Sequence, residues 1–234
     1  MTHIEIPGDF TGPARSAQGG IAAGLLAGHL DGSAEVRLHA PPPLATSLRV
    51  DETDGGLEAW LDDTLVLSAR SKSLDVSIPD VDLDAAARAG VTPERQIAPH
   101  CIVCGDRHAR GLGVFPGPVD GSTVIGTKWT PPAWTAGASG SVSDELVWGV
   151  LDCPGSWSHL AGGGFPAGSF PALGSIAVDL LEPIPVNDPV VVLGWPLEVD
   201  GRKYRAATAI VGPAGTALAV SNQTCIALPL AWAA

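Results

Sequence analysis

The chain has 234 residues, of which 45% are hydrophobic and 16% charged, so it holds enough apolar material for a sizeable core and is not intrinsically disordered. Its formal net charge of −12 excludes sequence-independent nucleic-acid binding, which needs a basic surface. The first residues lack a signal-peptide pattern, and no apolar run approaches the ~20 residues that span a bilayer. We therefore expect a soluble cytoplasmic protein whose four cysteines are reduced thiols.

The first part of the chain predicts one helix followed by strands. Residues 18–29 have the composition of a helix that packs against a core. Stretches rich in β-branched residues, or alternating between apolar and polar, predict strands over 34–40, 46–54, 57–60 and 64–78.

Beyond residue 78 the sequence predicts a linker and then a similar order of elements. The linker holds a short helix at 84–89, and strands are expected over 112–116 and 122–129. A second helix is expected over 143–153, where Pro154 and the following glycine should stop it. Four further strands are predicted at 175–182, 189–199, 202–211 and 216–228.

Three blocks of similar sequence occur twice, in the same order along the chain. The matching pairs are 19–27 with 144–152, 32–38 with 174–180, and 64–68 with 216–220. We interpret them as an internal duplication, with a first unit at 1–80, a linker at 81–110 and a second unit at 111–234. A helix on a long antiparallel sheet, repeated in tandem, is an α+β architecture.

The region leading into the second helix resembles the hotdog-fold thioesterases. It reads Cys-Ile-Val-Cys-Gly at 101–105, Gly-Leu-Gly-Val-Phe at 111–115 and Ser-Gly-Ser-Val-Ser-Asp-Glu at 139–145, and six residues separate this last stretch from Asp152. The family has His-Gly-Gly where this chain has Ser-Asp-Glu at 143–145. The resemblance implies a double hotdog that hydrolyses an acyl-CoA or acyl-carrier thioester without a cofactor.

The resemblance also implies where the active site lies, because the acid of one hotdog helix faces the N-terminus of its partner helix. Asp152 would then act as base or nucleophile with Gly19 and Gly20, whose backbone N–H groups can stabilise an oxyanion. The thioester carbonyl oxygen is expected beside the Gly20 N–H group, and Gln18 is a further candidate site residue. Ser156 is a further candidate, for orienting water or substrate. A lone aspartate near a helix end can instead be a local cap.

The opposite pairing of the two units lacks these groups. Ala27 stands where the first unit would carry its acid, and the second helix begins with Asp144 and Glu145, whose carboxylates repel an oxyanion. We therefore expect one active site per chain, shared between the units.

A zinc site and two alternative functions have weaker support in the sequence. His100, Cys101, Cys104 and His108 could supply four zinc ligands, but the resembling families have this Cys-x-x-Cys turn without needing metal, and we predict no metal site. A non-catalytic thioester-binding module and a hotdog-type enoyl-CoA hydratase are the alternative functions. The hydratase would be expected to carry an Asp-x-Asn-x-x-His pattern, which the sequence lacks.

The expected partners follow from these predictions. They are a thioester substrate and a second copy of the chain in a homodimer, with neither nucleic acid nor membrane. The candidates for contacts to the phosphates of coenzyme A are Arg70, Lys72, Arg202, Lys203 and Arg205.

Overall fold

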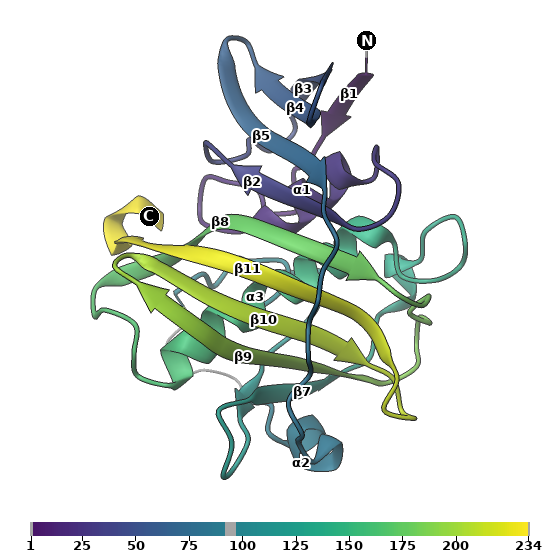
Figure 1. The fold of residues 1–234 in the computed structure, drawn as a ribbon, viewed down its shortest axis with the longest axis vertical. Coiled ribbons are helices and arrows are strands. Elements are labelled where there is room, and N and C mark those ends of the chain that lie inside the picture. The colour runs from purple at the N-terminus through teal and green to yellow at the C-terminus, as the bar shows by residue number, and fades with distance from the viewer. Residues whose placement is uncertain (1, 92–96, 234) are drawn as a thin grey trace.

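The computed structural model describes residues 2–91 and 97–233. These residues form one sheet of eleven antiparallel strands in the order β1-β3-β4-β5-β2-β8-β11-β10-β9-β7-β6 (Figure 1). The first half contributes β1 (Thr2–Glu5), β2 (Ala34–Leu38), β3 (Ser47–Thr53), β4 (Gly56–Leu61) and β5 (Thr64–Ser71). The second half contributes β6 (Gly117–Pro118), β7 (Ile125–Trp129), β8 (Ser169–Leu180), β9 (Val190–Asp200), β10 (Lys203–Val211) and β11 (Ala217–Pro229).

The two halves of the sheet meet at β2 and β8. Ala34–Arg37 pairs there with Ser175–Val178, and the strand order read outwards from this seam is β2-β5-β4-β3 on one side and β8-β11-β10-β9 on the other. Beyond Arg37 the register of β2 with β8 ends, although β8 begins at Ser169. The first residues of β8 therefore lack a β2 partner, and the sheet is open at this end of the seam.

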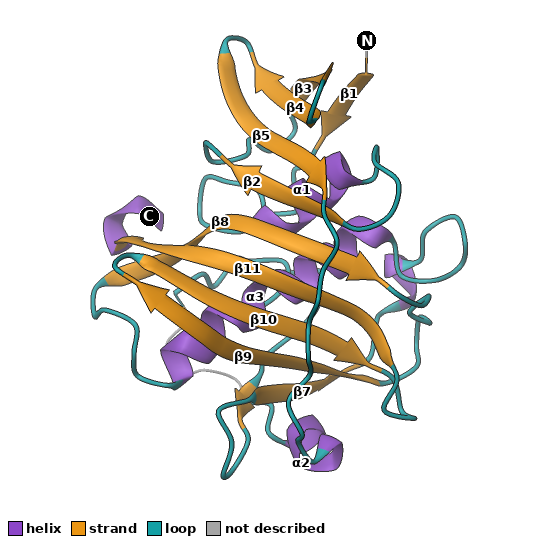
Figure 2. Ribbon diagram, in the orientation of Figure 1, coloured by secondary structure: helices purple, strands orange, loops and turns teal. Residues whose placement is uncertain are grey.

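Two helices cover the same face of the sheet, one from each half (Figure 2). They are α1 (Gly19–Ala27) and α3 (Asp144–Ala161), and the shorter α2 (Leu83–Arg88) packs beside β7. The predicted α+β class with two tandem helix-on-sheet units is confirmed, whereas the unit boundaries and the duplication itself stay predictions. In the described part of the chain, no helix is long and apolar enough to span a bilayer.

Glycines bring α1 and α3 into direct backbone contact. A Cβ atom on Gly20 would lie 2.5 Å from the carbonyl oxygen of Trp148, and one on Gly24 would lie 2.7 Å from the Cα of Glu145. Since the later residue of α1 touches the earlier residue of α3, the helices run antiparallel. This close approach places the N-terminus of α1 against Asp152.

We expect Gly24→Ala to destabilise the protein by about 1–3 kcal/mol, because the added methyl group would overlap the α3 backbone. The matched control is Gly28→Ala, at a position with φ −60° where the nearest atom to a new Cβ is 3.5 Å away. Thermal unfolding followed by circular dichroism should show a lower Tm for Gly24→Ala and an unchanged or raised Tm for Gly28→Ala. Equal Tm values would contradict the close helix contact.

The prediction that Pro154 stops the second helix is wrong, because α3 continues to Ala161. Pro154 has no N–H group and leaves a backbone carbonyl of the preceding turn without its helical partner. Side chains from the sheet bond the helix in this region: Thr208 Oγ1 donates to the carbonyl of Leu151 at 2.9 Å, and Gln223 Nε2 donates to that of Asp152 at 2.8 Å. The sheet therefore holds the helix across the proline.

The segment after β5 leaves the sheet earlier than predicted. The strand expected over 64–78 ends at Ser71, and the chain then crosses the outer face of the sheet towards α2 (Figure 1). Val76 and Ile78 of this segment pack against a buried cluster that includes Trp195 and Ala207. These apolar side chains gave the pattern of a strand but cover a sheet face instead.

One more predicted strand is absent, and the two-residue strand β6 was not predicted. Residues 112–116 are not a strand, because the N–H groups of Leu112 and Val114 bond the carbonyls of Ile102 and Val103 rather than a sheet neighbour. Strand β1 was not predicted. The expected linker includes residues 92–96, which lie outside the described residues.

Candidate active site

A cavity of about 280 Å³ opens where the two halves of the sheet separate. Gln18, Gly19, Asp152 and Ser156 all line it, so the structure brings these candidates from distant parts of the chain to one place. Gly20 joins them through its backbone N–H group. Most of the remaining wall is apolar and includes Trp157, Leu160, Phe170, Leu173, Ile226 and Trp232.

Asp152 is held on one side of its carboxyl group only. Its Oδ2 atom accepts hydrogen bonds from the Gly20 N–H group at 3.0 Å and from Gln18 Nε2 at 2.6 Å. Its Oδ1 atom accepts no hydrogen bond from the described residues. With the residue only 7% exposed, this free oxygen is left to bond a water or substrate in the cavity.

Gln18 fixes both the start of α1 and the direction of the carboxyl group. It is the N-cap residue, and its Oε1 atom accepts a hydrogen bond from the Ile21 N–H group at 2.7 Å. Because the amide oxygen is engaged by this donor, the amide nitrogen must face Asp152. One side chain therefore couples the helix terminus to the acid.

The buried environment changes the acidity of Asp152. Burial raises the pKa of its carboxyl group to about 7, although the hydrogen bonds from Gly20 and Gln18 lower it. A carboxyl group with a pKa near neutrality is suited to act as a general base, because it accepts a proton readily and about half of it is ionised at neutral pH.

The backbone N–H groups of Gly19 and Gly20 differ in their hydrogen bonding. The Gly20 N–H group donates to Asp152, so it is not free for the thioester oxyanion that was expected beside it from the sequence. The Gly19 N–H group, at the first position of α1, has no hydrogen-bond partner among the described residues, and Gly19 lines the cavity. An unpaired donor at a helix N-terminus is a site where negative charge is stabilised.

Ser156 lies one turn after Asp152 because α3 continues past the proline. Its Oγ atom is 3.0 Å from the sulfur of Cys225 on β11. The hydroxyl group is thus engaged with the sheet, and orientation of substrate by Ser156 stays a prediction.

The C-terminus of α1 and the N-terminus of α3 lack the groups that surround Asp152. Ala27 lies at the end of α1, and the Ser143 hydroxyl donates to Glu145 at 2.7 Å instead of capping the α3 backbone. A cavity of about 240 Å³ near this terminus is lined by Asp144, Val147 and the stretch 180–184 among others. No aspartate on α1 faces it, because α1 contains none.

The four-ligand zinc arrangement considered from the sequence is not assembled in the described residues. His108 Nε2 lies 2.6 Å from the Asp9 carbonyl oxygen, and His100 is exposed. The sulfur atoms of Cys101 and Cys104 instead gather with that of Cys153 on α3, all within 4.8 Å of one another. The spacing within the sequence gave no sign of Cys153, because its nearness depends on how α3 packs.

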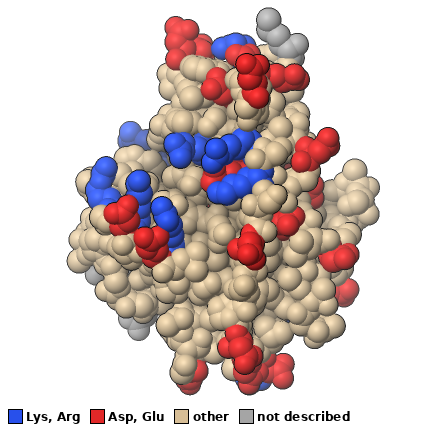
Figure 3. All heavy atoms as spheres, in the orientation of Figure 1, with Lys and Arg blue, Asp and Glu red and all other residues tan. Residues whose placement is uncertain are grey.

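Basic side chains gather on the outer face of the sheet, in a chain that is acidic overall (Figure 3). Arg70 and Lys72 both pair with Glu35 beside β2, and Arg205 pairs with Glu198. Lys203 pairs in register with Ile226, which lines the cavity. The backbone of Lys203 on β10 therefore neighbours a residue of the cavity wall.

No protein-family model and no curated protein matches the sequence. Solved structures match nearly all of it: the tesB protein of Mycobacterium avium subspecies paratuberculosis has a TM-score of 0.62 at 13% identity, covering 97% of this chain and 92% of that one. A protein of unknown function with a hot dog fold from Alicyclobacillus acidocaldarius has a TM-score of 0.61 at 13% identity, covering 97% and 92%.

A third structure, described as a thioesterase superfamily protein, has a TM-score of 0.50 at 18% identity and covers 64% of this chain and 68% of that one. At these identities the likeness concerns the fold. The predicted double hotdog, and the resemblance on which it was based, are confirmed at this level.

Proposed function

Given the double-hotdog fold, we propose that this chain hydrolyses acyl thioesters at the cavity shared by α1 and α3. The observation that carries the proposal is the arrangement of Asp152, whose Oδ2 atom is fixed by the N-terminus of α1 while its Oδ1 atom faces the cavity unbonded. Similarity to structures named tesB and thioesterase superfamily protein supports the same chemistry.

The proposed reaction uses Asp152 as a general base. Its Oδ1 atom takes a proton from a water molecule as the water oxygen attacks the thioester carbonyl carbon. The negative charge that develops on the carbonyl oxygen is stabilised by the Gly19 N–H group and the α1 terminus. The intermediate then collapses to the carboxylic acid product and expels the thiolate. The thiolate takes the proton from Asp152, which gives the free thiol and returns Asp152 to its ionised form.

The walls of the cavity indicate the class of substrate. Aromatic and aliphatic side chains such as Trp157, Phe170 and Leu173 surround the space beyond Asp152, which suits an apolar acyl chain. The register of Lys203 beside Ile226 supports a contact from this lysine to an anionic carrier such as coenzyme A. A panel of acyl-CoA thioesters of increasing chain length tests this assignment, and binding without turnover would favour the alternative of a thioester-binding module.

The rate of hydrolysis should depend on pH in a defined direction. Because the base must be ionised and its pKa is raised to about 7, kcat/KM should rise about tenfold per pH unit below 7 and level off above it. The profile is measured from about pH 5 to 9 with chelator-treated protein. A profile that is flat over this range would contradict a base with a raised pKa, because an ordinary aspartate, which titrates near pH 4, would already be ionised throughout it.

A further inference from the structure

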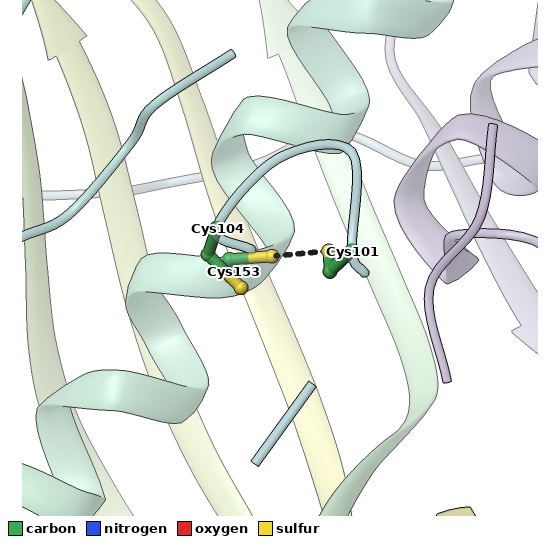
Figure 4. Close-up of side chains that lie close together, drawn as sticks. All are labelled: Cys101, Cys104 and Cys153. Atoms are coloured by element: carbon green, nitrogen blue, oxygen red, sulfur yellow. Dashed lines mark hydrogen bonds between the residues drawn. The ribbon is translucent and has the colours of Figure 1, made fainter. Parts of the chain in front are cut away.

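A cluster of three cysteines lies beside the proposed active site but takes no part in the proposed reaction. Cys101 and Cys104 come from the turn before β6, and Cys153 comes from α3, directly after Asp152 (Figure 4). All three thiols are free, and the residues are 3%, 6% and 8% exposed, respectively. The fourth cysteine, Cys225, is not part of the cluster.

We propose that Cys101, Cys104 and Cys153 form a three-thiolate site for a thiophilic metal ion of the Zn²⁺ class. Their sulfur atoms lie within 4.8 Å of one another, and those of Cys101 and Cys153 are 3.9 Å apart. Thiolates bound to tetrahedral zinc at about 2.3 Å are about 3.8 Å from each other, so small side-chain movements would close the site. Binding would release the thiol protons to solvent.

The backbone around the cluster is built to hold the cysteines in place. The Gly105 N–H group bonds the Cys101 carbonyl at 2.8 Å, which closes the Cys-x-x-Cys turn. A side chain at Gly105 would not fit, because a Cβ atom there would lie 2.5 Å from the carbonyl oxygens of Pro99 and Cys101. The residues between the two cysteines are fixed by bonds from Leu112 and Val114 to Ile102 and Val103.

The cluster also has a place for a fourth ligand. Cys101, Cys104 and Cys153 all line the cavity that holds Asp152, so a water molecule or another small ligand in that cavity is the candidate for the fourth position. Three protein ligands with an open position form a recognised type of zinc site. The site does not depend on thioester hydrolysis and could exist without it.

The test is a metal titration of the full chain, reduced and treated with chelator, using Co²⁺ as the spectroscopic probe. Wild type should bind one Co²⁺ per chain with intense thiolate-to-metal charge-transfer absorption, and Zn²⁺ should displace it, whereas Mg²⁺ should give no signal because it prefers oxygen ligands. Cys101→Ser, Cys104→Ser and Cys153→Ser should each bind at least about tenfold more weakly. Cys225→Ser is the matched control and should behave like wild type.

Several results would overturn the proposal. The first is the absence of charge-transfer absorption in wild type. The second is a loss of Co²⁺ affinity in Cys225→Ser equal to that in the three cluster variants, and the third is an unchanged Co²⁺ affinity in Cys153→Ser. Because a serine variant can fail to fold, Zn²⁺ must also raise the Tm of wild type, and a failure to do so counts against the site. A disulfide formed with oxidised glutathione in a chain that binds no metal would identify a redox pair instead.

Discussion

Replacing Asp152 with asparagine is expected to lower kcat/KM for thioester hydrolysis at pH 8 by at least about 100-fold. The asparagine oxygen can still accept the hydrogen bonds from Gly20 and Gln18, so the site should keep its shape while losing its base. The matched control is Glu145→Gln, which removes a carboxylate from the other end of α3, where it accepts a bond from Ser143. Glu145→Gln should hydrolyse the same substrate within a few-fold of the wild-type rate.

Asp152→Asn should also stabilise the folded protein. This gain in stability separates a loss of catalysis from a loss of folding. The native state keeps the Asp152 proton up to about pH 7, while the unfolded chain releases it near the ordinary aspartate pKa of 3.8. The stability that the bound proton contributes is therefore complete below about pH 4 and lost as pH rises through 7. Relative to wild type, Asp152→Asn should gain up to about 4 kcal/mol in free energy of unfolding at pH 8.

Urea unfolding at pH 4 and at pH 8 measures this difference. The two proteins should be similar in stability at pH 4, and the variant should be more stable at pH 8. An inactive variant that is also less stable at pH 8 would mean that the carboxylate serves the fold, and the assignment of Asp152 as base would lose its support.

Gly19→Pro is expected to lower kcat by about 10²–10³ relative to Gly19→Ala, because it removes the N–H group assigned to the oxyanion. Proline is tolerated at the first position of a helix, and the extended conformation of Gln18, with φ −65° and ψ 124°, suits a residue before proline. The two variants share the same new Cβ atom, which would lie 3.0 Å from the end of the Leu173 side chain. Comparing them therefore removes the contribution of the Cβ atom and leaves that of the lost N–H group together with the proline ring that replaces it.

Substrate affinity should change much less than kcat between these two variants, since the oxyanion develops only in the transition state. Equal kcat values for Gly19→Pro and Gly19→Ala would show that the oxyanion is stabilised elsewhere. Loss of helix α1 would also lower kcat, and comparing the circular dichroism and Tm of the two proteins tests for it.

Local patterns in the sequence located most of the sheet and both long helices, because β-branched stretches and glycine-rich turns act over short distances. They failed where a contact from another part of the chain decides the structure. Helix α3 continues past Pro154, where Thr208 and Gln223, on strands far along the chain, bond the carbonyls of Leu151 and Asp152. The stretch around Val76 has the alternation of a strand but lies across a sheet face.

In the candidate site too, contacts between distant parts of the chain could not be predicted from the sequence. Asp152, Gln18, Gly19 and Gly20 were predicted through a family resemblance, and the structure brings them together. The resemblance could not assign Gly20 to Asp152 and leave Gly19 free, because that depends on the closeness of two helices. Cys153 joins Cys101 and Cys104 only once α3 is docked on the turn, so no sequence spacing reveals the cluster.

The most direct test of a single active site shared by both units is a crystal structure with an acyl-CoA analogue whose thioester sulfur is replaced by a methylene group. One analogue per chain should bind, with its carbonyl oxygen about 3 Å from the Gly19 nitrogen and its carbonyl carbon facing Asp152 Oδ1. Two analogues per chain, or a carbonyl group beside Asp144 and Glu145, would contradict the account.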